Sequence, residues 1–226
     1  MKKIAVMGST GKMGQEILQV LKQKKISAAE FSEGKPANKK NLTGAEAIID
    51  FTTAEAFDEI LQLAVESKTP FVSGTTGISA DQKRALSLAS KKIPVLWAPN
   101  MSLGVALLKK AVETLAQLHG FDFQIEEFHH RHKKDRPSGT ALALQETLQA
   151  SLKKHGNKAA LPAPLVGRAG GIVGIHKVYA ASEEELLCFE HQALNRRVFA
   201  KGAVQAAEWL ADKKPGLYHI EDLFND

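Results

Sequence analysis

The chain has 226 residues, of which 44% are hydrophobic and 24% charged, a composition typical of a soluble globular protein with a packed core. Its 30 Lys and Arg outnumber its 25 Asp and Glu, and the net charge of +5 suits an acidic small molecule at least as well as nucleic acid. A single cysteine excludes an intramolecular disulfide, and no segment reaches the roughly 18 to 20 apolar residues that cross a bilayer.

The N-terminal segment MKKIAVMGSTGKMG has no apolar region long enough for a secretory signal, so we expect a cytoplasmic protein without membrane contact. From there to about residue 100, short apolar runs alternate with helical patterns, which is typical of βαβ units. The predicted strands cover 4–7, 26–31, 47–51, 70–73 and 93–98. The predicted helices cover 12–24, a segment that follows 52–55, a segment from residue 79, and 103–119. Residues 32–44 are predicted to form a loop, and 52–55 and 79–82 have the spacing of a helix capping box.

The pattern changes after Gly120. The sequence predicts a strand over 121–131, a helix over 138–155, a loop over 157–170, a hairpin of strands 172–181 and 185–193, and a helix over 201–211. Neighbouring strands without intervening helices indicate a second module of the α+β type. We therefore predict an α/β protein in which a Rossmann-type parallel sheet domain, 1–102 plus 196–226, is joined to an α+β domain, 103–195.

A glycine motif, GSTGKMG over 8–14, lies between the first strand and the first helix. Glycines at 8, 11 and 14 let the backbone turn tightly and approach a pyrophosphate, and the helix N-terminus offers N–H groups to phosphate. The GxxGxxG spacing departs from the usual GxGxxG, so a glycine-rich turn without a ligand is the alternative.

The densest group of chemically active side chains is EEFHHRHKKDRPSGT, over 126–140. If the strand continues, His129, Arg131 and Lys133 share one face and His130 and His132 the other. The following helix opens with Ser-Gly-Thr, whose N–H groups and hydroxyls can accept a carboxylate. This combination predicts a pocket for a small dianion, with a histidine as proton donor.

Three alternatives compete for this segment: a solvated charge run, a zinc site of His130 and His132, and a nucleic-acid contact. The apolar strand before the segment and the helix cap after it argue against a solvated run. Zinc has neither a cysteine nor a clear third ligand here, and no aromatic platform accompanies the basic residues. We therefore expect no metal and no nucleic acid.

Taken together, the motifs resemble the 4-hydroxy-tetrahydrodipicolinate reductase (dihydrodipicolinate reductase) family. The resemblance is carried by the glycine motif, IDFT over 49–52, GTTG over 74–77, APNMS over 98–102, HHRHK over 129–133, PSGT over 137–140, RRVFA over 196–200 and GAV over 202–204. It runs in order along nearly the whole chain, and the histidine-lysine block with Ser-Gly-Thr is its most specific part. It implies an NADPH- or NADH-dependent reduction of a small dicarboxylate, 4-hydroxy-tetrahydrodipicolinate, to tetrahydrodipicolinate in diaminopimelate and lysine biosynthesis. It also implies a homotetramer built through the α+β domain. Because the chain crosses twice between the two predicted domains, we expect a hinge there that lets them close on the cofactor and the substrate.

The resemblance also assigns roles to residues. His129 and Lys133 match the catalytic positions, and the substrate contacts are His130, Ser138, Gly139, Thr140 and Arg196, the last in competition with Arg197. The positions that line the dinucleotide are Gly8, Ser9, Thr10, Gly11, Lys12, Met13, Ser32, Phe51, Thr52, Gly74, Thr75, Thr76, Ala98, Asn100 and Met101.

Two departures from the family pattern bear on the cofactor. The stretch before Ile49 is short, so we expect a strand–helix unit to be missing from the sheet. Ser32 falls where an acidic residue commonly holds the ribose of NAD, and with Lys12 and Lys35 nearby it would tolerate a 2′-phosphate. We therefore predict NADPH with NADH also usable, a preference that Glu30 or Glu33 would reverse in another register.

Two other functions compete with this one. A semialdehyde dehydrogenase needs an activated cysteine nucleophile, and Cys188, between apolar residues and downstream of three glutamates, is predicted to be a buried structural residue. A non-catalytic dinucleotide-sensing regulator would bind nucleic acid through the basic segment and would keep its function when His129 is neutralised.

Overall fold

The computed structural model describes residues 3–225, and the chain in it divides into two compact units. Unit 1 comprises Met1–Leu103 and Arg196–Asp226, and unit 2 comprises Gly104–Asn195. The chain therefore leaves unit 1 once, builds unit 2 and returns.

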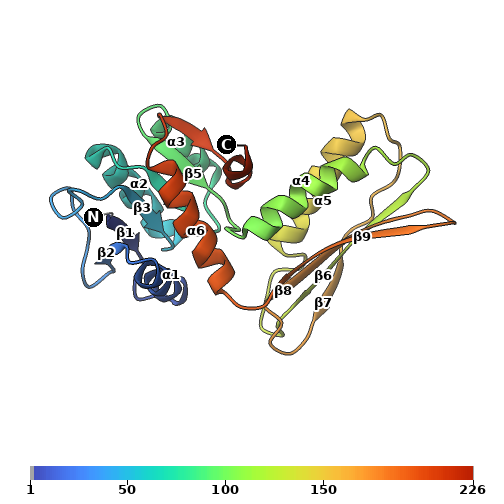
Figure 1. Cartoon of the computed structure of the whole chain (residues 1–226), viewed down its shortest axis with the longest axis horizontal. Helices are drawn as coiled ribbons and strands as arrows, with labels where there is room; N and C mark the ends of the chain where they lie inside the picture. The colour runs from blue at the N-terminus through green and yellow to red at the C-terminus, as the bar shows by residue number, and fades with distance from the viewer. Residues whose placement is uncertain (1–2, 226) are drawn as a thin grey trace. The chain divides into compact units, whose positions relative to one another are not determined.

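Unit 1 is a six-stranded parallel sheet with helices on both faces (Figure 1). The strands are β1 (Lys3–Met7), β2 (Ser27–Phe31), β3 (Ala47–Asp50), β4 (Phe71–Ser73), β5 (Pro94–Trp97) and β10 (Gly216–Tyr218), in the order β10-β5-β4-β3-β1-β2. The helices are α1 (Lys12–Gln23), α2 (Ala54–Ser67), α3 (Ala80–Ala89) and α6 (Arg197–Leu210), and a 3-10 helix covers Ile220–Phe224. Phe57, Leu61 and Leu86 of α2 and α3 pack on one face of the sheet, while α1 and α6 contact each other on the other.

The strand order places a ligand crevice in unit 1. From β1 the chain moves to β2 on one side and then to β3 on the other, so the order reverses between β1 and β3. Ligands of doubly wound sheets bind at the carboxyl ends of strands at such a reversal. β2 is the sheet's edge, and the described residues between it and β3 contain no helix, which confirms the expected loss of a strand–helix unit.

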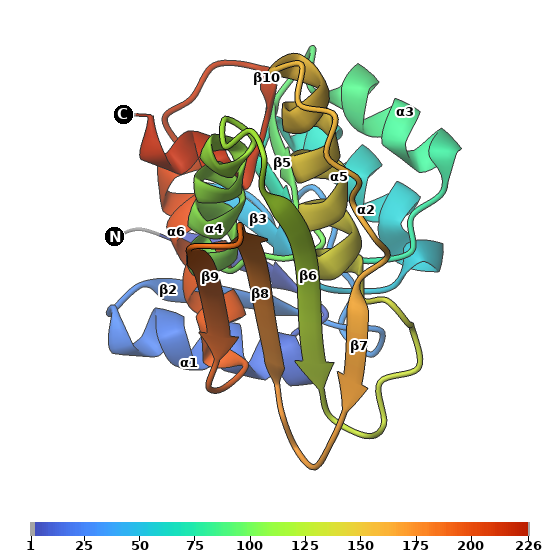
Figure 2. The ribbon, with the colours of Figure 1, turned by 90° about the vertical axis from the view of Figure 1, so that its right-hand side faces the viewer.

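Unit 2 is a four-stranded sheet with two helices on one face (Figure 2). Its strands are β6 (Asp122–His129), β7 (Leu165–Arg168), β8 (Gly174–Ala181) and β9 (Leu186–Ala193), in the order β7-β6-β8-β9. The β6–β7 pair is parallel and the other pairs are antiparallel, so the predicted β8–β9 hairpin is confirmed. The helices α4 (Leu103–Leu115) and α5 (Gly139–Lys154) place leucines such as Leu108 and Leu144 against Ile125 and Val178.

Residues of β6 alternate between the core face and the other face of the sheet. Phe123, Ile125, Glu127 and His129 are all buried on the face that α4 and α5 cover. The first two are apolar, as a core position requires, and the last two carry titratable groups. The core of unit 2 therefore ends in a polar cluster at the carboxyl end of β6.

Several predicted boundaries were wrong. β6 ends at His129 instead of 131, β7 lies inside the predicted loop 157–170, and β10 was not predicted. α6 begins at Arg197, one turn before the predicted start. α4 ends at Leu115, and Asn157 Nδ2 donates to the carbonyls of Ala116 (3.0 Å) and Leu118 (2.9 Å), which follow the last turn of the helix.

The two predicted capping boxes had opposite outcomes. Ser79 and Gln82 form theirs, with backbone and side-chain hydrogen bonds in both directions. The box over 52–55 was wrong, because Thr53 is the N-cap of α2 and makes no side-chain cap. Thr52 instead donates its hydroxyl (2.6 Å) and its N–H (3.0 Å) to Asp50.

Among the helices of the described chain, none is long and apolar enough to cross a bilayer.

Candidate active site

The glycine motif of unit 1 forms a close backbone turn between β1 and α1. Gly8 has a φ of +75°, and a Cβ there would lie 2.8 Å from the Phe51 carbonyl oxygen. A Cβ on Gly14 would overlap the carbonyl of Gly8, so this glycine lets α1 pack against the turn. The N-cap, Gly11, has no side chain to cap the helix, so the first turn of α1 directs its N–H groups outward. This is the geometry that binds a pyrophosphate.

A cavity of about 690 Å³ lies beside this turn, a volume suited to a small-molecule ligand. Six residues that the sequence assigned to the dinucleotide line it: Gly8, Thr10, Gly11, Ser32, Phe51 and Thr52. Apolar and acidic residues that were not predicted complete the wall, including Phe31, Glu33, Pro36, Glu59, Ile60 and Leu63. The apolar part of this wall fits the flat faces of an adenine ring.

Nine other predicted cofactor residues are not in this wall: Ser9, Lys12, Met13, Gly74, Thr75, Thr76, Ala98, Asn100 and Met101. The last six follow β4 and β5, at the same carboxyl edge of the sheet. The Gly74 Cα lies against the Phe51 ring, and Asn100 Oδ1 accepts the Ser102 N–H at 2.9 Å. Their contact with a dinucleotide stays a prediction.

Asp50 organises this edge, a role that the sequence analysis missed. Its buried carboxylate accepts hydroxyl hydrogen bonds from Thr52 (2.6 Å), Ser73 (2.7 Å) and Thr75 (2.8 Å). It thereby joins the residues that follow β3 to those at the end of β4. The signal was an acidic residue at the end of an otherwise apolar strand, AIID.

In unit 2, the cluster at the end of β6 is centred on Glu127, whose side chain is fully buried. Its Oε1 accepts the Ser138 N–H at 2.9 Å and Arg168 Nη2 at 3.0 Å. Its Oε2 lies 3.1 Å from His129 Nδ1 and 3.8 Å from His176 Nε2. The imidazoles of His129 and His176 meet edge to face, with their centroids 5.1 Å apart. Of these partners, only His129 and Ser138 were predicted site residues.

The contacts of this cluster fix its charges. Burial acts to raise the pKa of Glu127, but hydrogen bonds from His129, Ser138 and Arg168 outweigh it and lower the pKa to about 2. Burial lowers the pKa of His176 to about 3, aided by His129 and opposed by Glu127. At neutral pH the cluster therefore contains a carboxylate, a guanidinium and a neutral His176.

The segment 130–138 differs from the sequence prediction. Because β6 ends at His129, the predicted alternation of Arg131 and Lys133 against His130 and His132 along a strand was wrong. The segment is a loop, and Arg168 Nη2 donates to the Asp135 carbonyl at 2.6 Å and so holds it near Glu127. Lys133 Nζ pairs with the Asp135 carboxylate at 2.9 Å and remains partly exposed.

The start of α5 also differs in part. Ser138 is buried, and its hydroxyl accepts the Ala141 N–H at 3.2 Å as the helix N-cap. It lies 3.3 Å from His176 Nε2, and its predicted contact with a substrate carboxylate stays a prediction. Gly139 is exposed at the first helical position, and Thr140 is half-buried.

Arg196 and Arg197 belong to unit 1. Arg197 pairs with Glu16 of α1 at 3.2 Å and donates to Gln19 at 2.8 Å, so it has a structural role. Arg196 is exposed at the N-cap of α6, which leaves it as the candidate of the two for binding a ligand.

Cys188 is exposed on β9 opposite Tyr179, so its prediction as a buried residue was wrong. β9 is an edge strand that the helices cover only in part.

Among the described residues, metal-ligand spacing occurs only for Glu127, His129 and His176, not for His130 with His132. Arg168 already neutralises that carboxylate, so we assign no metal to it.

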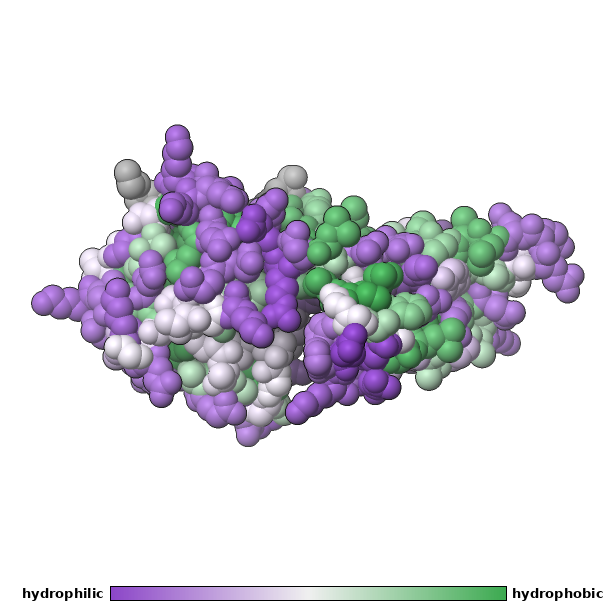
Figure 3. All heavy atoms as spheres, turned by 90° about the horizontal axis from the view of Figure 1, so that it is seen from below, coloured by the Kyte–Doolittle hydropathy of each residue, from purple (hydrophilic) through white to green (hydrophobic). Residues whose placement is uncertain are grey.

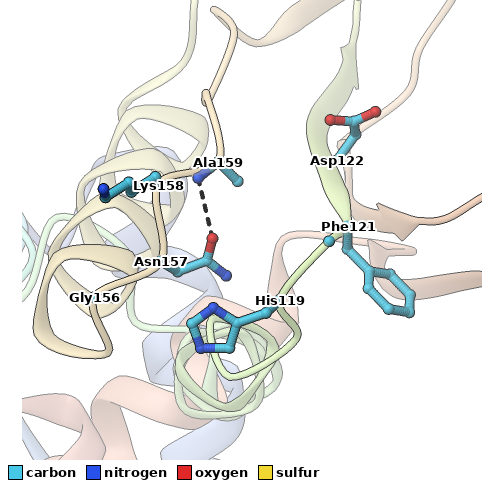
Figure 4. A pocket seen from close by; sticks show the side chains of 8 residues that line it. His119, Phe121, Asp122, Gly156, Asn157, Lys158 and Ala159 are labelled. Carbon is cyan, nitrogen blue, oxygen red and sulfur yellow. Dashed lines mark hydrogen bonds between the residues drawn. The ribbon is translucent and has the colours of Figure 1, made fainter.

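A cavity of about 430 Å³ in unit 2 lies at the amino end of β6, opposite to the Glu127 cluster (Figure 4). His119, Asp122, Asn157 and Lys158 are in its wall, and Asn157 Oδ1 accepts the Ala159 N–H at 3.0 Å. Its residues hold the ends of α4 and α5 together, and we assign it no part in the active site.

Comparison with known families agrees with this geometry. Residues 2–101 match the family model for the dihydrodipicolinate reductase N-terminus, and residues 104–224 match that for its C-terminus. The chain belongs to the dihydrodipicolinate reductase family. Members of this family are NAD(P)H-dependent oxidoreductases of diaminopimelate and lysine biosynthesis. The predicted family and the predicted two-part α/β fold are therefore confirmed.

Individual members of the dihydrodipicolinate reductase family match almost end to end. The 4-hydroxy-tetrahydrodipicolinate reductase of Bdellovibrio bacteriovorus is 52% identical over 223 residues, covering 98% of this chain and 95% of the relative. The 4-hydroxy-tetrahydrodipicolinate reductase of Stenotrophomonas maltophilia K279a is 41% identical over 238 residues, which cover 98% of this chain and 97% of the relative. A dipicolinate-bound dihydrodipicolinate reductase from Paenisporosarcina sp. TG-14 shares the fold, with a TM-score of 0.80 at 23% identity over 98% of this chain and 99% of the other.

Proposed function

We propose that this chain reduces 4-hydroxy-tetrahydrodipicolinate to tetrahydrodipicolinate with NAD(P)H, and that His129 donates the proton. Unit 1 is the dinucleotide-binding domain in this proposal, and unit 2 binds the substrate. The observation that carries the proposal is the place of His129: it is buried at the end of β6, against a carboxylate and beside the loop that carries Lys133. An imidazole held in this way can supply a proton at neutral pH.

The residues of unit 1 fit the dinucleotide. A Cβ on Gly8 or Gly14 would enter space that the backbone of the turn already uses, and the first turn of α1 has no side-chain cap. Gly8, Thr10 and Gly11 would hold the pyrophosphate, and the apolar wall with Phe31 and Ile60 would hold the adenine. When bound, the reduced dinucleotide supplies the hydride that the reaction needs.

The residues of unit 2 fit a small dicarboxylate. Lys133 and His130 provide positive and hydrogen-bonding groups on the loop, and Gly139 presents the N-terminus of α5, where a carboxylate is favoured. Arg196 is the further cation that we propose for substrate binding. The Paenisporosarcina relative, which is described as dipicolinate-bound, supports a dicarboxylate ligand for this fold.

The residues in the wall of the cavity beside the glycine motif bear on whether NADPH or NADH is preferred. Ser32 is in the wall as predicted, but Glu33 follows it there, and Lys12 and Lys35 are not among the lining residues. A carboxylate next to the ribose hydroxyls accepts their hydrogen bonds and repels a 2′-phosphate. We therefore propose that both cofactors are used and that NADH is favoured, which reverses the preference inferred from the sequence.

We further propose that the enzyme is a cytoplasmic homotetramer assembled through unit 2. The face of its sheet that α4 and α5 leave uncovered carries apolar side chains, including Leu165, Ile175, Tyr179 and Leu186. Leu165 on β7 is 55% exposed and Leu186 on β9 is 63% exposed, so large apolar side chains are open to solvent at both edges of this face. Figure 3 shows hydrophobic side chains gathered among hydrophilic ones on the part of its face that unit 2 forms. Association of copies would cover them.

The test is a coupled assay in which the pathway intermediate is generated freshly and the loss of NADH or NADPH absorbance is followed. The wild-type enzyme should consume reduced cofactor only when the intermediate is supplied. His129→Ala should lower kcat about 100-fold or more, the usual contribution of a positioned acid. His119→Ala, at the opposite end of β6, is the matched control and should retain turnover. Normal turnover of His129→Ala would remove His129 from catalysis.

A further inference from the structure

Two buried atoms at the end of β6, Glu127 Oε2 and His129 Nδ1, are each other's nearest charged or polar partner. Glu127 Oε2 and His129 Nδ1 lie 3.1 Å apart, and His176 Nε2 lies 3.8 Å from the same oxygen. Within residues 3–225 neither Oε2 nor Nδ1 makes a hydrogen bond of good geometry, to the other or to any further group. The other oxygen of Glu127 is already engaged by Ser138 and Arg168. Buried polar atoms in folded proteins are almost always paired, so this contact has to be explained.

The geometry points to Glu127 as the residue that positions His129. We propose that its carboxylate accepts the Nδ1 proton of His129, holds the imidazole in one orientation, and leaves Nε2 as the atom that exchanges a proton with the substrate. This inference rests on the proposed function, because it makes Glu127 act through the proposed proton donor. A carboxylate that orients an imidazole and stabilises its protonated form is an established way to build an acid–base residue.

The backbone makes this pairing rigid. Glu127 and His129 are two residues apart on one strand, so their side chains project from the same face of the sheet. Arg168 is the register partner of His129 on β7, and His176 is the register partner of Glu127 on β8. Three paired strands therefore hold the carboxylate and both of its neighbours.

The opposite side of the imidazole is kept clear by a glycine. A Cβ on Gly174 of β8 would approach His129 Nε2 to 3.1 Å, closer than almost all real contacts of this kind. With glycine there, Nε2 is not covered from β8. The carboxylate on one nitrogen and the glycine beside the other together define which nitrogen can serve the reaction.

The charges around the imidazole favour the same assignment. Glu127 on its own strand, Arg168 from β7, His176 from β8 with His191 of β9 beyond it, and Lys133 of the following loop are the titratable and charged groups that face this site. Arg168 compensates the carboxylate without touching Oε2, the oxygen that faces His129. His176 is neutral at neutral pH and does not compete as a cation for that oxygen.

The experiment combines imidazole ¹⁵N NMR of the ligand-free enzyme with steady-state kinetics over pH 5–9. In the wild type, His129 should show a protonated Nδ1 in its neutral form. Glu127→Gln removes the charge at constant size and should change that ¹⁵N pattern, lower kcat about 10-fold or more, and shift the pH profile of kcat. KM should change less than kcat, because Glu127 does not contact the substrate in this proposal.

The matched control is Glu126→Gln, the same substitution one residue earlier on the other face of the sheet, where Glu126 accepts a hydrogen bond from Tyr179 at 3.2 Å. It should leave the ¹⁵N pattern and the pH profile of kcat unchanged. Glu127→Asp keeps the charge but withdraws it by one methylene, so it should restore part of the lost kcat. It also serves as the second variant if Glu127→Gln does not fold.

The two readouts separate this inference from the proposed function. A wild-type His129 protonated on Nε2 instead of Nδ1, or an unchanged ¹⁵N pattern in Glu127→Gln with normal kcat, would overturn the positioning role while the reductase activity stands. A changed ¹⁵N pattern in an enzyme that does not reduce the pathway intermediate would establish the pair and overturn the proposed function instead.

Discussion

The carboxylate of Asp50 accepts a hydrogen bond from the Ser73 hydroxyl at 2.7 Å, across the carboxyl ends of two neighbouring strands. The same carboxylate accepts from Thr52 and Thr75, so Asp50→Ala would leave three hydroxyls without their acceptor. Hydrogen bonds to charged groups are worth roughly 1.5 to 3 kcal/mol each, so we expect a loss of about 3 kcal/mol or more in unfolding free energy. The KM for the dinucleotide should rise as well, because Thr52 lines the cofactor cavity.

Urea unfolding and cofactor kinetics of Asp50→Ala would check this expectation. Asp212→Ala, at an exposed position of unit 1, is the control and should change neither quantity. Unaltered stability in Asp50→Ala would mean that the three hydroxyls find other acceptors and that Asp50 does not organise this edge.

Gly202 of α6 lies directly against the backbone of Met101, where a Cβ would overlap the carbonyl oxygen. Gly202→Ala should therefore push the helix and the segment 98–102 apart. Overpacking of this kind costs about 1 to 3 kcal/mol, and here it displaces backbone, so we expect the upper end of that range. Thermal unfolding measures the loss, and Gly171→Ala, which has open space around the position, is the comparison. Equal stability of the two variants would contradict the close approach.

The sequence predicts those features that depend on residues close together along the chain, and it misses those that depend on residues far apart. The glycine motif, the Ser79 capping box and the N-cap at Ser138 were predicted because each depends on residues within one or two turns. β7 was missed because its four residues, LVGR, show no alternation and form a strand only through their pairing with β6. A short edge strand has no signal of its own.

The partners of Glu127 were missed for the same reason. Arg168 is 41 residues from Glu127 along the chain, and only the register of the sheet brings them together. His176 was given no role because the sequence does not show which residue of β6 it will oppose. The local pattern indicated a histidine as proton donor and the family resemblance singled out His129, whereas the group that we propose to position it required the structure.

The carboxylate of Glu33 provides a test of cofactor preference. Glu33→Gln removes the charge beside Ser32 in the cofactor cavity, so the repulsion of a 2′-phosphate should fall. We expect the ratio of kcat/KM for NADPH to that for NADH to rise about 10-fold, which corresponds to about 1.4 kcal/mol. Glu30→Gln, on the exposed side of β2 and outside the cavity wall, should leave the ratio as it is. A ratio that does not move in Glu33→Gln would place the ribose away from this residue.

The pH dependence of stability should follow from the pKa values of His176 and Glu127. Burial lowers the pKa of His176 from 6.5 to about 3, so below pH 6.5 the unfolded chain binds a proton that the folded chain does not. The contribution of neutral His176 to the free energy of unfolding is therefore fully present above pH 6.5. Below pH 6.5 this contribution falls by about 1.4 kcal/mol per pH unit. Glu127, whose pKa is lowered from 4.5 to about 2, adds a second loss that begins only below pH 4.5.

The variant His176→Gln isolates the first of these losses. At pH 7 the variant should be less stable than the wild type, because it disturbs a buried contact with Ser138. Between pH 6.5 and 5 the wild type loses about 2 kcal/mol through His176 and the variant does not, so the gap between their urea-unfolding free energies should narrow by that amount. If the gap is the same at pH 7, 6 and 5, His176 is not held neutral in the folded protein.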